Sequence, residues 1–351
     1  VVTDDTIFVT IGNECIALDA QTGRRRMAVY ATKGRDWGWL SAGKGQLLSA
    51  TVKSGSSYKA DSGEWYDSFG AGQVDRMVSD SLVSHDSATG KQQWAYRGGA
   101  VMNSTLTIAG NTIYFVESRN PEVAKSPTSR LMPAQLNAQH LVALDRVTGR
   151  KLWEKPVDFS KCETMLYLLH AKGTLIATGT DQAKKYHTYA YDVSSPALRF
   201  AEKPLINANV PQLWKKEHAA GMARRGKIST DHGGLIQHPL VVKEVVYTDN
   251  RAYALRSGKL MRDDLPERIK CGNMAASNHS MFFRNFFHGI WDMETDKRIQ
   301  LKGIRSGCWL GIIPAQGLML APESSSGCFC THSIQTSAAW VPRSALKKPK
   351  E

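Results

Sequence analysis

The sequence has no long apolar segment. No run approaches 18 uncharged apolar residues, and this excludes a membrane-spanning helix. The mean hydropathy of −0.33 agrees with that conclusion. Signatures of nucleic-acid-binding modules are also lacking. Nine tryptophans, eleven tyrosines and ten phenylalanines among 351 residues supply enough aromatic core to exclude a largely disordered chain.

The charge balance is basic. Lys and Arg number 45 against 32 Asp and Glu, which gives a formal net charge of +13. A surplus of this size can serve an anionic partner such as an acidic polysaccharide, a membrane surface or nucleic acid. The basic residues form only short clusters, at residues 24–26, 215–216, 224–225 and 347–348. We therefore favour a solvated basic surface, with a functional anion-binding face as the alternative.

The first residues already read as a β-strand. The segment Val1–Val9 alternates in the manner of a strand and a turn, and no signal-peptide pattern precedes it. A natural N-terminus seldom begins inside a sheet, so we expect upstream sequence in the full-length protein. At the other end, we expect residues 343–351 to form a basic C-terminal tail.

Internal repetition is the strongest feature of the sequence. The pattern Asp-x-x-Thr-Gly-x-x-x-Trp occurs from Asp86 to Trp94 and from Asp145 to Trp153. A third copy begins at Asp19 and has a Thr-Gly pair but no tryptophan. Weaker copies follow later in the chain. The residues that replace the tryptophan in the altered copies are Met27, Phe200 and Gln300.

Each repeat has the chemistry of a β-hairpin. Asp and Thr side chains bond the amides of a tight turn, and Gly takes the positive φ that the turn needs. A second hairpin signal precedes the copies, for example at residues 106–115. Two hairpins make one four-stranded antiparallel sheet. Repetition of such a sheet at intervals of about 40–67 residues is typical of propeller blades.

The sequence thus predicts an all-β fold, a β-propeller of four-stranded antiparallel blades. We expect one domain over residues 1–342 with seven visible blades, and upstream sequence could complete an eighth. The only helix we expect is a short one around residues 211–224. The third strands of the blades should lie near residues 16–19, 82–86, 141–145, 188–192, 252–255, 289–292 and 337–341.

The Asp-x-x-Thr-Gly-x-x-x-Trp pattern resembles the repeat of pyrroloquinoline-quinone-type (PQQ-type) propellers. That repeat is found in quinoprotein alcohol dehydrogenases and in the propeller lipoprotein of the outer-membrane β-barrel assembly machine. Further segments resemble a bacterial exported subfamily of PQQ-binding-like propeller repeat proteins whose activity is unsettled, so the resemblance implies a fold rather than a reaction. These segments are residues 231–234, 237–240, 305–309, 313–318 and 328–330.

Three long insertions point to one face of this fold. If the strands of a blade are labelled A to D, the B–C loops and D–A links lie on one face, and the A–B and C–D turns lie on the other. Residues 54–77 and 118–139 interrupt B–C connections, and residues 203–238 read as a long D–A link. We call this face the long-loop face and the opposite one the short-turn face. Long loops on a rigid scaffold commonly carry function.

We expect a ligand site at the axial mouth of the long-loop face, because D–A links converge there. A His beside a carboxylate could act as a general base near neutral pH, and Arg with Trp could bind an anionic or sugar ligand. The structural alternative is that the histidines are buried and bonded to backbone carbonyls. The candidate lining residues are Asp231, His232, His238, His288, Arg305 and Trp309, with Tyr58, Trp65 and Tyr66 on a covering loop.

Four of the six cysteines lie between residues 271 and 330. We predict two disulfides among Cys271, Cys308, Cys328 and Cys330, of undetermined connectivity, which implies an oxidising compartment. Cys15 and Cys162 pair with each other, pair with upstream sequence, or are free. The alternative is a zinc or copper site, because Cys-x-Cys-x-His places soft ligands along one extended segment. Its ligands would be Cys308, Cys328, Cys330 and His332.

These features favour a non-catalytic propeller, exported to the bacterial periplasm or to the outside of the cell. It would bind a ligand or act as a scaffold, with an anionic glycan or another exported protein as partner. The first alternative is a carbohydrate-active lyase or hydrolase that uses His, Tyr and Arg. The second is a quinoprotein dehydrogenase, but the resemblance implies an adjacent Cys-Cys pair, and Phe329 separates Cys328 from Cys330. We predict no cofactor, and PQQ or a bound metal is the alternative.

The disulfide prediction can be tested by thiol titration of the denatured, unreduced protein. Of six cysteines, two disulfides use four, so at most two free thiols should react. Four or more reactive thiols, released together with stoichiometric zinc, would instead support the metal site.

Overall fold

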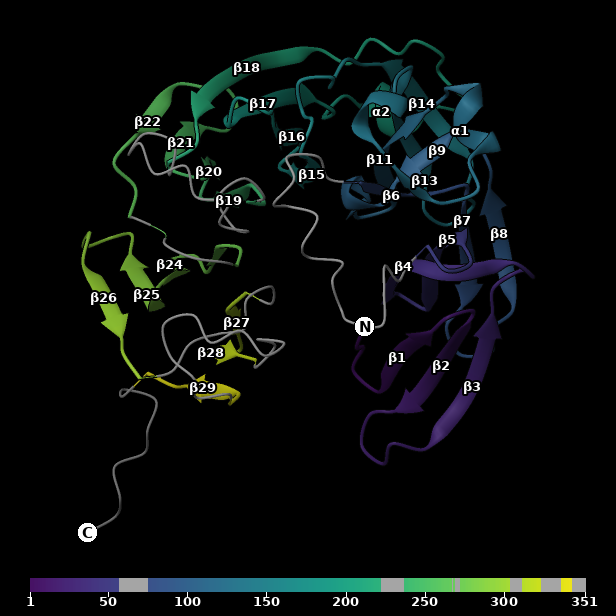
Figure 1. Cartoon of the computed structure of the whole chain (residues 1–351), viewed down its shortest axis with the longest axis horizontal. Helices are drawn as coiled ribbons and strands as arrows, with labels where there is room; N and C mark the ends of the chain where they lie inside the picture. The colour runs from purple at the N-terminus through teal and green to yellow at the C-terminus, as the bar shows by residue number, and fades with distance from the viewer. Residues whose placement is uncertain are drawn as a thin grey trace. The chain divides into compact units, whose positions relative to one another are not determined.

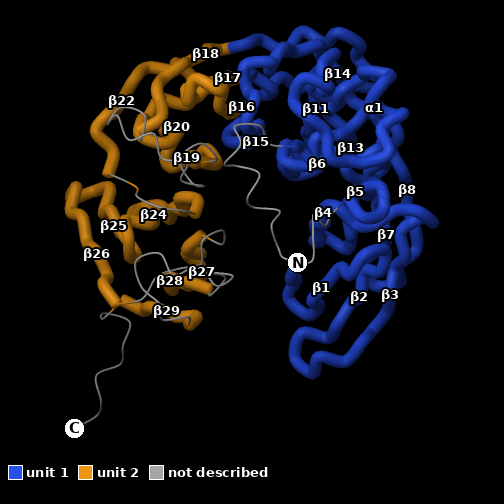
Figure 2. The backbone as a smooth tube through the Cα atoms, in the orientation of Figure 1, with its two compact units in different colours: residues 1–177, 191–212 blue, residues 178–190, 213–351 orange. Residues whose placement is uncertain are grey.

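The computed structural model describes residues 1–56, 75–221, 237–266, 268, 272–303, 311–322 and 336–342. Within them the protein is almost entirely β-structure, with seven antiparallel sheets (Figure 1). Packing divides the chain into two compact units, residues 1–177 with 191–212 and residues 178–190 with 213–351 (Figure 2). The only helices in this part of the chain are short: α1 (Pro121–Lys125), α2 (Pro196–Arg199), and the 3₁₀ turns η2 (Asn103–Thr105) and η3 (Pro133–Gln135).

The first three sheets lie in the first unit. The first contains β1 (Thr6–Ile11), β2 (Glu14–Asp19) and β3 (Arg25–Tyr30). The second contains β4 (Arg35–Gly43), β5 (Gln46–Lys53), β7 (Ser81–Asp86) and β8 (Gln92–Tyr96). The third contains β9 (Ala100–Met102), β10 (Thr107–Ala109), β11 (Thr112–Ser118), β13 (Gln139–Asp145) and β14 (Lys151–Pro156), and is extended beyond β9 by β6 (Arg76–Ser79) and β12 (Arg130–Leu131).

The remaining sheets follow in chain order. The fourth contains β15 (Met165–Ala171), β16 (Thr174–Thr180), β17 (Lys185–Asp192) and β18 (Gln212–Ala219). The fifth contains β19 (Leu240–Val242), β20 (Val245–Thr248), β21 (Arg251–Ala254) and β22 (Leu260–Arg262). The sixth contains β23 (Ala275–Ala276), β24 (Ser280–Asn285), β25 (Phe287–Asp292) and β26 (Arg298–Leu301). The seventh contains β27 (Ile313–Ala315), β28 (Leu318–Ala321) and β29 (Ala338–Trp340).

The predicted blade pattern is confirmed. Strands β2, β7, β13, β17, β21, β25 and β29 coincide with the seven segments expected as third strands. Each of the seven sheets in the described residues is therefore one propeller-type blade.

The prediction for residues 203–238 is wrong in two respects. Residues 212–219 form β18, the fourth strand of its blade, where we expected a short helix. Residues 203–211 consequently belong to a long C–D connection rather than to a D–A link. The aromatic residue of the fourth strand is Trp214, whereas Phe200 lies outside the sheet and is 75% exposed. The prediction was based on the repeat spacing, which has a short turn after the aspartate. After Asp192 the chain instead contains α2, so the fourth strand begins later than the spacing predicts.

The repeat turn has the predicted hydrogen bonds. In the third blade, the Asp145 carboxylate accepts from both the backbone N–H and the hydroxyl of Thr148, each at 2.8 Å. Gly149 follows with a φ of +70°. The same bonds occur between Asp19 and Thr22 in the first blade, and between Asp86 and Thr89 in the second.

The turn also receives the tryptophan of the preceding blade. The indole N–H of Trp94, from β8, donates to the backbone carbonyl of Arg146 at 3.0 Å. The same ring lies against Gly149 so closely that a Cβ there would be 2.5 Å from it. The fourth and fifth blades repeat this contact with Trp214. Its indole N–H donates to the Leu255 carbonyl at 3.0 Å, and a Cβ at Gly258 would lie 2.6 Å from its ring. We call this contact the Trp–Gly joint.

A hydrophobic core of the first unit lies around this joint. Trp94 packs in a cluster with inward-facing residues of the second and third sheets, among them Leu48, Leu82, Phe115 and Val142. Tyr96 meets Phe115 edge to face, with ring centroids 5.6 Å apart. Alternate residues of both sheets supply this core, which is the arrangement expected when the faces of two blades pack together.

The two B–C insertions of the second and third blades interlock. Strand β6 pairs with β12 through Arg130–Met77 and Leu131–Arg76, and on its other side with β9. The hydroxyl of Ser56 accepts from the Ser129 backbone N–H at 2.9 Å. These bonds join the insertions into one layer on the long-loop face of the first unit.

The Trp–Gly joint predicts a large difference between two glycine variants. Both Gly149→Ala and Gly23→Ala put alanine at a φ near +70°, which costs about 1–2 kcal/mol. Only Gly149→Ala also overlaps an indole ring, which should add about 1–3 kcal/mol, because nothing lies within 4 Å of a Cβ at Gly23. Denaturant unfolding of the two variants measures the difference, and equal losses of stability would contradict the joint.

Candidate binding pocket

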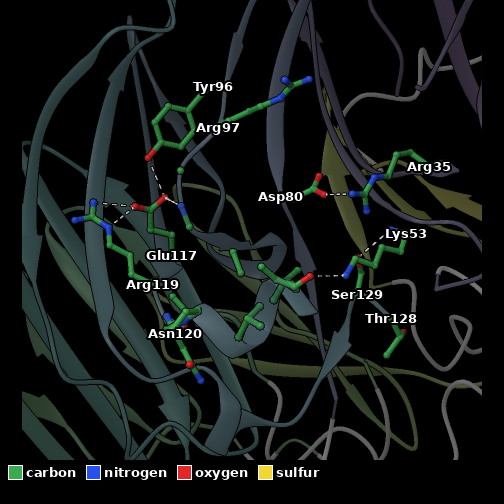
Figure 3. Close-up of a pocket in the computed structure, with 18 of the residues that line it drawn as sticks. Arg35, Lys53, Asp80, Tyr96, Arg97, Glu117, Arg119, Asn120, Thr128 and Ser129 are labelled. Atoms are coloured by element: carbon green, nitrogen blue, oxygen red, sulfur yellow. Dashed lines mark hydrogen bonds and ion pairs between the residues drawn. The ribbon is translucent and has the colours of Figure 1, made fainter. Parts of the chain in front are cut away.

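A pocket of about 630 Å³ opens on the long-loop face of the first unit (Figure 3). Its walls come from the starts of β4, α1 and β14, the ends of β5, β6, β8 and β11, and the link between β8 and β9. All of these segments belong to the second and third blades and their insertions. The volume is in the range of small-ligand and side-chain binding sites, which is roughly 300–1,000 Å³.

Glu117 organises one wall of the pocket. Its carboxylate is fully buried and accepts three hydrogen bonds. The donors are the Tyr96 hydroxyl at 2.9 Å, the Gly99 backbone N–H at 3.0 Å and the Arg119 Nε at 2.9 Å. Burial, together with the negative charge of Glu117, raises the pKa of Tyr96, so the phenol stays protonated and remains a donor.

Two glycines let the β8–β9 link close around this carboxylate. A Cβ at Gly98 would lie 2.2 Å from the Tyr96 hydroxyl and 2.7 Å from the Glu117 carboxylate. A Cβ at Gly99 would lie 2.3 Å from the Ser118 carbonyl. Any larger residue at either position would push the link away from β11, so the Gly-Gly pair is required for the close approach.

Ion pairs surround the Glu117 group. Arg119 forms a two-pronged pair with Glu154 at 2.9 and 2.6 Å, in addition to its bond with Glu117. Lys151 also donates to Glu154. Across the pocket, Arg35 is paired with Asp80 (Figure 3). These cations are therefore neutralised within the protein.

Two other cations of the pocket have no carboxylate partner among the described residues. Arg97 is exposed, forms no ion pair or side-chain hydrogen bond within that part of the chain, and extends from the end of β8 away from Glu117 (Figure 3). The Lys53 ammonium donates only to the backbone carbonyls of Ala124 and Ser126, the first at 3.2 Å.

Most residues predicted for the axial site lie outside the described residues: Tyr58, Trp65, Tyr66, Asp231, His232, Arg305 and Trp309. His238 is exposed, and its backbone N–H donates to the Asn273 side chain at 3.1 Å. His288 is fully buried in β25, with its ring edge-on to Trp340 at a centroid distance of 4.8 Å. The axial site therefore stays a prediction.

The cysteine predictions also concern mainly residues that the structure does not describe. Cys271, Cys308, Cys328 and Cys330 lie outside the described residues, as does His332. Cys15 and Cys162 are both described and buried, and they form no disulfide with each other. Burial raises the pKa of Cys15 to about 11, which keeps this thiol protonated and unreactive.

Sequence reasoning missed one buried His–carboxylate pair in the second unit. His187 Nε2 lies 2.8 Å from the Asp181 carboxylate, with the Glu217 carboxylate 3.5 Å from Nδ1. His187 is 2% exposed and belongs to β17, so the pair joins a strand to the preceding loop. The residues are six apart in sequence across a turn, and that spacing was the available signal.

The comparisons with known proteins agree with the blade architecture. A family model described as outer membrane protein assembly factor BamB matches residues 71–158. BamB from Moraxella catarrhalis matches over 92% of this chain and 80% of its own, with 11% identity and a TM-score of 0.54. A computationally designed protein, Ika8, matches over 92% and 79%, with 9% identity and a TM-score of 0.57. A sequence comparison with curated proteins found no significant match.

The repeated blades and their joints define a β-propeller protein. Its Asp-Thr-Gly turns and fourth-strand tryptophans, together with the family-model match and the structural likeness to BamB, make it a PQQ-like repeat β-propeller protein. In the part of the chain that the structure describes, no helix is long and apolar enough to cross a membrane.

The ion pairs of the pocket predict an acid-sensitive contribution to stability. Hydrogen bonds from Arg119 and Lys151 lower the pKa of Glu154 from 4.5 to about 2, against the opposing effect of burial. Between those pH values the unfolded chain takes up a proton that the folded chain does not, so the free energy of unfolding should fall as the pH drops from 4.5 toward 2.

The test is urea unfolding of Glu154→Gln at pH 6 and pH 3. The variant should be less stable than the wild type at pH 6, and the difference should shrink at pH 3. Glu122→Gln is the matched control, because Glu122 forms an exposed pair with Lys125. An undiminished difference at pH 3 would count against the assigned role of Glu154.

Proposed function

We propose that this protein is a non-catalytic propeller of the bacterial envelope that binds another protein and acts as a scaffold or assembly component. The likeness to BamB, an outer membrane protein assembly factor, supports this class of role. The observation that carries the proposal is the pocket on the long-loop face. There the two insertions interlock, and two cations have no carboxylate partner among the residues that the structure describes.

The chemistry of the pocket supports recognition rather than reaction. Its carboxylates are bonded to cations, and its hydroxyls are bonded to neighbouring groups. The Tyr96 hydroxyl donates to Glu117, that of Ser118 donates to the Asn137 carbonyl at 2.6 Å, and that of Ser129 accepts from the Lys53 backbone. A nucleophilic hydroxyl needs a general base that takes its proton. The Tyr96 and Ser118 protons are instead donated to the ion-paired Glu117 carboxylate and to a backbone carbonyl.

The position of the pocket on the long-loop face supports a protein as the binding partner. The interlocked insertions surround the pocket with an extended layer of loop surface, and loops on a rigid scaffold are the usual recognition elements of propellers. A carbohydrate-active or quinone-dependent reaction draws no support from the described residues.

Photo-crosslinking can test the face that binds. A benzophenone amino acid at position 124 lies in the pocket wall, and one at position 122 lies beside it, next to the lining residues Pro121 and Val123. The same group at position 21 or 88 lies in an exposed C–D turn on the short-turn face. In extracts of the cells that make the protein, positions 122 and 124 should yield a discrete protein adduct, and positions 21 and 88 should not. Adducts at positions 21 and 88 alone, or at none of the four, would reject the proposal.

A further inference from the structure

Among the described residues, the pocket has two more basic side chains than carboxylates that neutralise them. Five basic side chains line it, namely Arg35, Lys53, Arg97, Arg119 and Lys151. Three of them are neutralised by Asp80, Glu117 and Glu154. Lys53 and Arg97 remain, and neither contacts a carboxylate in the described part of the chain. A small part of the protein's net charge of +13 therefore lies at a defined place in the described part of the chain.

Arg97 is held in place by its neighbours although its own side chain is unengaged. Tyr96 on one side and Gly99 on the other are both bonded to the buried Glu117 carboxylate. The backbone that carries Arg97 is therefore fixed at two points, and the guanidinium reaches outward from a rigid base. The fixed backbone lowers the entropic cost of binding, because only the side chain of Arg97 has to be ordered when a ligand arrives.

Lys53 is placed at the opposite wall. Its ammonium donates to two carbonyls that follow each other closely at the end of α1, Ala124 and Ser126. An ammonium has three donors, so one remains for a ligand. The pocket thus offers one planar, forked cation and one compact cation on different walls.

The rest of the lining is not that of a simple inorganic-anion site. Val78, Ala100 and Val123 add apolar surface between the charged groups. A ligand that suits all of these walls has carboxylates for the two cations and short methylene stems for the apolar side chains. Glutamate and aspartate side chains on a peptide have this chemistry, and arginine recognises carboxylates through two parallel hydrogen bonds.

Resting on the protein-binding role proposed above, we infer that this pocket binds an acidic peptide segment of the partner. Arg97 is the anchor for one carboxylate, and Lys53 contacts a second. The two insertions and the Gly-Gly link position these cations, and the ion pairs with Asp80 and Glu154 prevent the remaining basic groups from competing for the ligand.

The test measures binding of a fluorescent hexaglutamate peptide by anisotropy at 150 mM salt, with hexaglutamine as the uncharged control. The wild type should bind hexaglutamate and not hexaglutamine. Arg97→Gln should weaken binding about tenfold or more, as expected for loss of hydrogen bonds to a charged group. Arg97→Lys should retain part of the affinity, since it keeps the charge and loses the fork.

Arg24→Gln is the matched control. Arg24 is exposed in a C–D turn on the short-turn face, and its loss changes the net charge by the same amount. Affinity in this variant should stay within about twofold of the wild type, because a distant exposed charge is largely screened. Equal losses in Arg24→Gln and Arg97→Gln would overturn the inference, since they would show binding to a diffuse basic surface.

Two further outcomes would also overturn it. One is absence of hexaglutamate binding at 150 mM salt while the crosslinked adduct at position 122 persists, which would leave the scaffold role standing and reject the acidic ligand. The other is displacement of the peptide by inorganic phosphate or acetate at concentrations similar to that of the peptide, which would indicate a site for small anions. Because Arg97 is exposed and unbonded, its variants should keep the wild-type unfolding midpoint, and this excludes misfolding as the cause of any loss.

Discussion

The contact of a fourth-strand tryptophan with the next blade's turn is the interaction on which the blade arrangement depends. Trp94 fills the space over Gly149 and donates its indole N–H to the Arg146 carbonyl, so one side chain satisfies a carbonyl and closes the gap between two sheets. Glycine therefore has two functions in the repeat. It adopts the positive φ of the turn, and it leaves room for the ring. This explains why Thr-Gly and Trp recur together in the sequence although they meet across different blades.

In other blades, different residue pairs take the places of the tryptophan and glycine of the joint. Met27 replaces the tryptophan in the first blade, and its sulfur would lie 3.2 Å from a Cβ at Gly90. Between the fifth and sixth blades the joint is ionic. Arg262 lies over the Trp291 ring at 5.1 Å and contacts the Asp296 carboxylate at 3.2 Å, and Asp296 takes the glycine position with a φ of +57°. This joint thus keeps the position of the contact with different residues, whereas Trp214 and Gly258 retain the original pair.

The candidate pocket follows from this rigid framework. Because the joint and its core fix the second blade against the third, their B–C insertions emerge side by side and pair as β6 and β12. The β8–β9 link, which connects the same two blades, is drawn onto Glu117 by its two glycines. Arg97 is consequently presented to solvent from a segment whose neighbours are fully bonded. The site is a product of two blades and cannot be assigned to either repeat alone.

Local features of the sequence are enough to specify the blade. Alternation within strands, the Asp-Thr-Gly turn and the spacing to tryptophan are local features, and they placed all seven third strands and the two insertions that form the pocket. Only the tertiary structure showed that Trp214 rather than Phe200 completes the fourth blade, because the connection after Asp192 is long and its length is not encoded in the repeat. Only the structure separated the paired cations from Arg97 and Lys53. Residues 35 and 80, or 119 and 154, are far apart in the chain, and each pair meets only because non-consecutive strands of one blade come together in space.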